Sequence, residues 1–178
     1  MKNTIFLPIL LVICSSLLLI SCNNEPKNKC KYDPPEAFFS AEDPNITSHD
    51  FQLEGMKSTE SATFTNRFTL NVLQSGCESL SQEYRFEIPG QFQDQQDPAF
   101  WIELTVQSFG SLTNTGPKFS PLAQSLAQLI QSQEEYIKLG EEMPLPQMGF
   151  ALTINKVVSS DFGTLLVELE ELEGNQVQ

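Results

Sequence analysis

Apolar and polar side chains alternate in several separate stretches of this chain, and no other feature constrains its fold as strongly. A period of two is typical of a β-strand that buries one face. Turn-forming residues such as Ser75-Gly76 and Pro89-Gly90 separate the alternating runs. The pattern predicts about six strands, which we place at residues 51–53, 64–72, 84–88, 100–106, 150–158 and 165–172.

One stretch follows the helical period instead. Ser120 precedes Pro121, which is the usual order of a capping residue and a first helical residue. Gly140 stands where a helix commonly ends. The apolar residues in between fall on one helical stripe, at Leu122, Leu126, Leu129, Ile130 and Ile137. We therefore predict a single helix over residues 121–139.

Together these elements predict one α+β domain over residues 49–178. We expect an antiparallel sheet of about six strands, with one helix inserted before the last hairpin and packed on a sheet face. A β-sandwich with an inserted helix is the alternative, because four predicted strands precede the helix and would suffice to cover both faces of a sheet.

The first 22 residues carry an export signal. Lys2 precedes an apolar run over residues 5–20, which has the length of a signal-peptide core and falls short of the ~20 residues of a membrane-spanning helix. The run ends in Leu19-Ile20-Ser21-Cys22. This sequence resembles the lipobox of bacterial lipoproteins. An ordinary secretory signal or an N-terminal anchor helix is the alternative interpretation.

The resemblance implies that residues 1–21 are removed as a signal peptide and that Cys22 carries a diacylglycerol thioether. Acyl chains of this kind anchor a protein stably without a spanning helix. Residues 22–48 would then form a lipidated tether and N-terminal extension. Asn23 follows the cysteine where an aspartate would mark retention in the inner membrane. The resemblance thus implies an address in the bacterial cell envelope, at the outer membrane.

Two cysteines remain after Cys14 leaves with the signal and Cys22 carries lipid. An exported chain meets an oxidising compartment, where two thiols most simply form one disulfide. We therefore predict a bond between Cys30 and Cys77, with two free thiols as the alternative. The bond would limit the free tether to residues 23–29, which reach about 25 Å at most.

The charge of the chain excludes some classes of partner. It has 23 Asp and Glu against 10 Lys and Arg, for a net charge of −13. Such a charge argues against binding to nucleic acid and against electrostatic docking on anionic lipid. We expect contact with the membrane through the N-terminal lipid and with another envelope protein.

We find no residue pattern that predicts catalysis or a cofactor. His49 is the only histidine, and we expect it on the surface at the start of a strand. Its neighbour Asp50 would face the other side of that strand, so the two cannot form a relay. Asp94 and Asp97 lie in the polar loop 91–98, but two carboxylates without a fixed register do not define a calcium site. We expect no metal and no cofactor.

The predicted strand at 100–106 suggests a binding surface. Trp101 would lie on the polar side of this strand, in line with Phe109 and close to Asp94 and Asp97. Exposed aromatic side chains beside amides are common in binding sites. The competing interpretation is that a helix or a second sheet covers the tryptophan.

These features predict a lipid-anchored envelope protein that acts as a non-catalytic binding or accessory module. One alternative is an immunity or inhibitor lipoprotein that neutralises a protein partner. A carboxylate-dependent hydrolase is another, and it would require two acidic side chains facing each other in a cleft.

Overall fold

The computed structural model describes residues 30–65, 68–133 and 138–172. Its strands form one seven-stranded sheet in the order β1-β2-β3-β4-β7-β6-β5, and every neighbouring pair is antiparallel. The elements in chain order are β1 (Ile46–Glu54), β2 (Lys57–Phe64), β3 (Thr69–Gly76), β4 (Leu80–Pro89), α2 (Pro98–Leu112), the short 3-10 helix η2 (Pro117–Phe119), α3 (Ser120–Gln133), β5 (Met143–Leu145), β6 (Phe150–Val158) and β7 (Phe162–Glu171).

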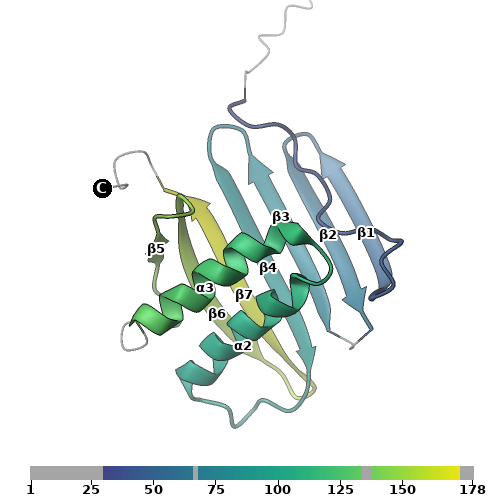
Figure 1. The fold of residues 1–178 in the computed structure, drawn as a ribbon. Coiled ribbons are helices and arrows are strands. Elements are labelled where there is room, and N and C mark those ends of the chain that lie inside the picture. The colour runs from purple at the N-terminus through teal and green to yellow at the C-terminus, as the bar shows by residue number, and fades with distance from the viewer. Residues whose placement is uncertain (1–29, 66–67, 134–137, 173–178) are drawn as a thin grey trace, which may run out of the picture.

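The two α-helices of the described residues, α2 and α3, lie on the same face of the sheet, across its central strands (Figure 1). The predicted antiparallel α+β class is confirmed, whereas the sheet has seven strands where about six were expected. A second helix and the short edge strand β5 were not predicted. No described element covers the opposite face of the sheet.

The strand predicted at 100–106 is wrong, because these residues belong to helix α2. Asp97 caps the helix by accepting the Ala99 N–H at 3.0 Å, and Pro98 occupies its first turn. Apolar residues occupy both even and odd positions in this stretch. They therefore fit the 3.6-residue period of a helix as well as the alternation of a strand. The buried side chains of the helix are Trp101, Ile102, Thr105, Phe109 and Leu112.

The long strand predicted at 64–72 is also wrong, because the chain turns back between β2 and β3. The Phe64 N–H donates to the Phe68 carbonyl at 3.0 Å, and the two rings stack at 4.3 Å between centroids. Phe64, Leu70 and Val72 are buried on the same face of the sheet. Their even spacing continues through the turn, so the alternation alone does not reveal the hairpin.

The helix predicted over residues 121–139 is confirmed over Ser120–Gln133, whereas Lys138 and Leu139, which were expected to end it, are not helical. Its stripe buries Leu122, Leu126 and Leu129 against the rest of the core. The Ile130 and Ile137 side chains, which were expected on the same stripe, lie outside the part of the chain that the structure describes. The two helices and the sheet enclose a core rich in aromatic rings, in which Phe109 meets Tyr84 and Phe86 edge to face.

The segment at residues 30–45 completes this core. Phe39 is 6% exposed and packs against Phe64 and Phe119 at ring distances of 5.5 and 5.3 Å. The packed body therefore includes residues of the stretch that the sequence assigned to the N-terminal extension.

Substitutions at two glycines are expected to change the stability of the fold in opposite directions. A Cβ on Gly163 would lie 2.9 Å from the rings of both Trp101 and Phe92, whereas one on Gly110 would meet nothing within 4 Å. We predict that Gly163→Ala destabilises the fold by about 1–3 kcal/mol through overpacking. Gly110→Ala, inside helix α2, should stabilise it by ~0.5–1 kcal/mol. Urea unfolding of the two variants measures both changes, and a Gly163→Ala variant as stable as wild type would contradict this packing.

Candidate functional site

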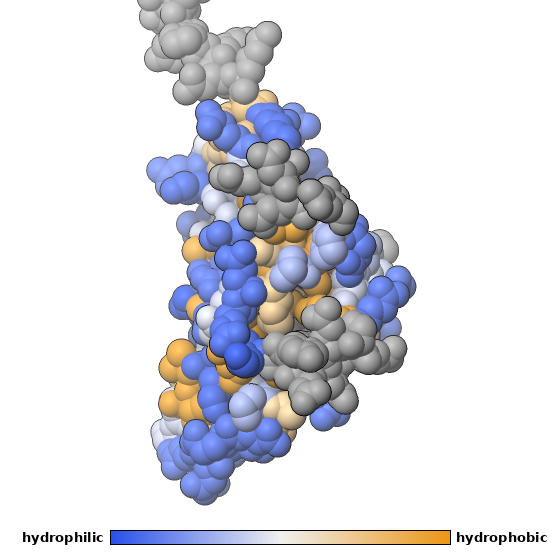
Figure 2. Space-filling view, turned by 90° about the vertical axis from the view of Figure 1, so that its left-hand side faces the viewer, coloured by the Kyte–Doolittle hydropathy of each residue, from blue (hydrophilic) through white to orange (hydrophobic). Residues whose placement is uncertain are grey.

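The uncovered side of the sheet, here called the open face, is formed by the strand residues that point away from the helices (Figure 1). Its side chains alternate with those of the core, and the strand register aligns them in rows. One row is Gln52, Thr59, Leu73, Glu83, Glu168 and Thr153. The next row is Asp50, Ser61, Asn71, Arg85, Leu166 and Asn155. Neither row contains an aromatic side chain, and most of their residues carry hydroxyl, amide or carboxylate groups. Val157 and Phe162, which are 63% and 42% exposed, have the same parity as these rows on β6 and β7 and add apolar surface at the β6–β7 turn. Figure 2 shows hydrophobic residues gathered at its lower left.

Negative charge gathers in the middle of the open face. Glu83 on β4 stands directly opposite Glu168 on β7. Like charges in this position destabilise a sheet. Arg85 donates to Glu83 at 3.0 Å, and the Asn155 amide donates to Glu168 at 3.4 Å. Glu87 and Glu170 lie on the same two strands and face, so one arginine is set among four carboxyl groups. The centre of the face therefore keeps a surplus of negative charge.

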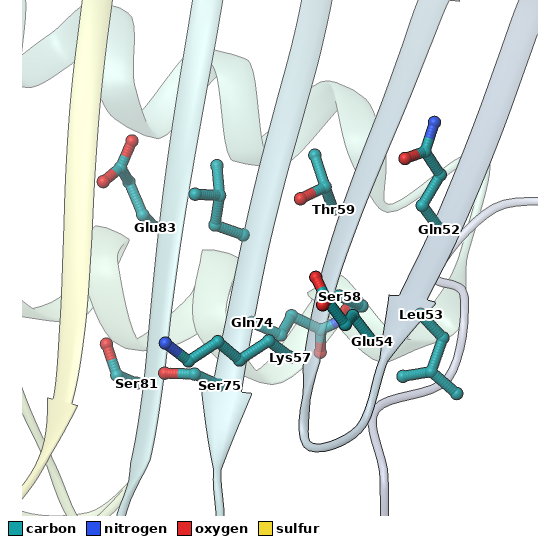
Figure 3. Close-up of a pocket in the computed structure, with 11 residues that line it drawn as sticks. Gln52, Leu53, Glu54, Lys57, Ser58, Thr59, Gln74, Ser75, Ser81 and Glu83 are labelled. Carbon is teal, nitrogen blue, oxygen red and sulfur yellow. The ribbon is translucent and has the colours of Figure 1, made fainter.

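A hollow of about 450 Å³ lies between β1 and β4 at the end of the sheet that carries the β1–β2 turn, and its lining combines open-face residues with Leu53, Ser58 and Gln74 from the helix side. Figure 3 shows its rows side by side, with Glu83, Thr59 and Gln52 in one and Ser81, Ser75, Lys57 and Glu54 in the next. Small-molecule sites are mostly apolar and enclosed. Leucines are the only apolar residues in the lining of this hollow, which favours contact with a polar macromolecular surface over capture of an apolar ligand.

On the helix side of the sheet, a buried carboxyl group holds the N-terminal segment. Glu60 on β2 is 0% exposed. Its two oxygens accept the main-chain N–H groups of Phe38 at 2.8 Å and Phe39 at 3.0 Å. His49 Nε2 lies 2.7 Å from the same carboxyl group. A buried carboxyl group without such partners would be strongly destabilising, so Glu60 fixes the segment in place.

The expectation that His49 is a surface residue is wrong. Its side chain is 12% exposed and hydrogen-bonded to Glu60. His49 pairs with the buried Ala62, and side chains paired across two strands point to the same face of a sheet. The His49 side chain therefore faces the helix side. Burial raises the pKa of the neighbouring Tyr84 phenol, and the charge of Glu60 raises it further.

The predicted disulfide is confirmed by a sulfur–sulfur distance of 2.08 Å between Cys30 and Cys77. The Lys31 N–H also donates to the Cys77 carbonyl at 2.7 Å. Farther across the sheet, Glu171 accepts hydrogen bonds from Lys31, from Tyr32 and from the Leu80 main-chain N–H. The described chain thus begins at the end of the sheet that carries the β3–β4 turn.

The predicted surface at Trp101 and Phe109 is wrong, because both side chains are 0% exposed. A helix turns residues four and eight positions apart onto one side, and here that side packs on the sheet. The Trp101 indole donates to the Gln95 carbonyl at 3.1 Å. Lys156 donates to the same carbonyl at 3.1 Å and lies 5.1 Å from the indole ring. The tryptophan therefore fastens the loop 91–98 to the body.

The other predicted residues have separate locations. Asp97 caps helix α2 and Asp94 is exposed in the loop before it. Within the described ranges, no group of three or more His, Cys, Asp or Glu side chains is placed to hold a metal ion. None of the described helices is long and apolar enough to cross a membrane. Cys22 lies outside the described residues.

Comparison with known proteins adds no relative to these observations. No family model, no curated protein and no solved structure matches the chain.

Sequence reasoning missed Glu60 and the open face. Glu60 has the same parity as Ala62 and Phe64, and an acidic residue at a core position is a signal of a buried interaction. The open face depends on which strands are neighbours, which alternation within each strand does not reveal.

The contacts of Glu171 predict a pH dependence of stability. Its hydrogen bonds from Lys31, Tyr32 and the Leu80 N–H lower the pKa of the carboxyl group from 4.5 to about 2. The folded state lowers this pKa, so the ionised Glu171 carboxyl group adds to the free energy of unfolding. This contribution is complete above pH 4.5 and is lost as the pH falls toward about 2. Thermal unfolding should show Glu171→Gln to be less stable than wild type at neutral pH, with the difference vanishing near pH 2.

The matched control is Glu170→Gln, which changes an exposed neighbour on the opposite face. Its difference from wild type should stay small throughout the same pH range. A Glu171→Gln deficit that is independent of pH would contradict the assignment.

Proposed function

We propose that this protein is a lipid-anchored protein of the bacterial cell envelope that acts as a non-catalytic binding module through its open face. The observation that supports this most directly is the asymmetry of the sheet. One face is packed under two helices and the N-terminal segment, while the other presents aligned rows of polar and charged side chains. A face without a layer over it is free to receive a partner.

The lipobox-like sequence before Cys22 supports the anchor. With Cys30 bonded to Cys77, seven residues separate the lipidated cysteine from the packed body. Such a tether reaches about 25 Å. The body would therefore work close to the outer membrane and meet partners that are themselves at or near that surface.

The environment of the ionisable groups favours binding over catalysis. His49 and Glu60 hydrogen-bond to each other, and the Glu60 carboxyl group is 0% exposed and also bonded to the N-terminal segment. Glu83 and Glu168 do face each other, but on an open surface and bonded to Arg85 and Asn155. General acid–base pairs of carboxyl groups work in clefts that desolvate one of them.

A second candidate function is neutralisation of a basic protein, as an immunity or inhibitor lipoprotein. The carboxyl groups along β4 and β7 favour it, because facing glutamates repel each other until a cation or basic side chain lies between them. Both candidates use the open face and differ in the charge of the partner.

Site-specific crosslinking in living cells tests the proposal. A photoreactive amino acid in place of the 42% exposed Leu73 should give one discrete protein adduct. The matched control is Gln124, which is exposed on α3 on the other side of the body and should give none. Loss of the adduct in Glu83→Lys/Glu168→Lys would favour the basic partner. An adduct from Gln124 alone, or from neither position, would contradict use of the open face.

The same cells test the anchor. A labelled fatty acid should be incorporated into wild type and not into Cys22→Ala, and the adduct should weaken when the lipid is missing. Equal labelling of both proteins would exclude lipidation at Cys22.

A further inference from the structure

The two edges of the sheet differ in their protection against strand addition. Edge strand β5 has three residues, Met143–Leu145, and prolines stand at Pro144 and Pro146. Prolines and short length are the usual devices that prevent another chain from pairing with an edge. Edge strand β1 has nine residues and no proline. Within the described ranges, nothing pairs with its outer side, and Figure 1 places it at the margin of the sheet.

The turn between β1 and β2 determines which main-chain groups point outward. Gly55 and Met56 form a two-residue loop between the paired residues Glu54 and Lys57, and the φ of +61° at Gly55 fits the primed turns of such hairpins. The closing pair of a two-residue hairpin exchanges hydrogen bonds, and bonding alternates along the strand. The N–H and C=O groups of His49, Phe51 and Leu53 are therefore directed away from β2.

The side chains of β1 specify what an added strand would carry. Toward the open face, β1 presents the exposed carboxyl groups of Asp50 and Glu54. Toward the helix side, it presents the partly buried Phe51 and Leu53, which is 49% exposed. An added strand also alternates between the two sides. Basic residues would lie beside Asp50 and Glu54, and apolar residues beside Phe51 and Leu53.

We propose that the β1 edge binds an extended segment of a partner protein, with alternating basic and apolar residues, as an eighth strand of the sheet. Main-chain hydrogen bonds would give the affinity and the alternating side chains the specificity, as in other cases of strand addition. This inference rests on the proposed binding role and extends the open face by one strand. A second copy fits less well, since it would bring the same two carboxyl groups and the same net charge of −13.

A defined peptide tests the proposal. The probe is a capped heptapeptide of alternating lysine and valine, and its control has the same composition with four lysines followed by three valines. Both are titrated against the mature lipidated protein, residues 22–178, in phosphatidylcholine nanodiscs. Hydrogen exchange should slow at His49, Phe51 and Leu53 with the alternating peptide only. Equal binding of the two peptides, or slowed exchange on β3 and β4 instead of β1, would overturn the proposal.

Variants of β1 distinguish main-chain from side-chain contributions to peptide binding. Leu53→Pro removes an outward N–H without breaking the β1–β2 ladder and should weaken binding about tenfold, whereas Leu53→Thr keeps the N–H and should bind within about threefold of wild type. Asp50→Lys/Glu54→Lys should prefer a peptide of alternating glutamate and valine. Equal binding by Leu53→Pro and wild type would refute strand addition.

The outcomes distinguish this inference from the proposed function. Failure of the peptide experiment, with crosslinking from Leu73 intact, would overturn only the use of the β1 edge. Self-association of the wild type that Leu53→Pro abolishes would identify a second copy as the occupant and overturn the heterologous partner.

Discussion

The buried carboxyl group of Glu60 is the interaction on which the architecture of this domain most depends. Two helices cross the central strands, and the segment at residues 30–45 covers the aromatic residues nearer β1 and β2. Glu60 binds this segment by accepting two main-chain N–H groups, from Phe38 and Phe39, which places both rings against the core. With that cover complete, the apolar face of the sheet is closed and its other face has no structural need for a second layer.

The sequence predicted the class of the fold because alternation and helical period are local signals. It also predicted helix α3, whose start is marked by Ser120 and Pro121. The predicted bond between Cys30 and Cys77 came from counting thiols under the expectation that the chain is exported. It failed at Trp101 because apolar residues at both even and odd positions fit the period of a helix and that of a strand equally well. The signal that distinguishes a helix here is Asp97 followed by Pro98, which lies just before the stretch 100–106. It failed at the β2–β3 hairpin because Phe64 and Phe68 have the same parity across the turn.

The disulfide and the contacts of Glu171 link this one-sided fold to its proposed place in the envelope. Both act at the end of the sheet where the described chain begins, so a lipid on Cys22 would hold that end toward the bilayer. The strands then run away from the anchor, and the open face and the β1 edge extend along their length. The cover of one face only leaves the open face, and the strand order leaves the β1 edge, so these two features produce the surfaces proposed for binding.

Hydroxyl-radical footprinting tests the central claim most directly, with two leucines of the same strand as internal controls. Leu70 is 0% exposed on the covered face of β3 and Leu73 is 42% exposed on the open face. In purified protein, Leu73 should be oxidised and Leu70 protected. In native envelopes, Leu73 should become protected by its partner, while Pro121 on α3 keeps its reactivity. Equal oxidation of Leu70 and Leu73 in the purified protein, or equal reactivity of Leu73 in both preparations, would contradict the account.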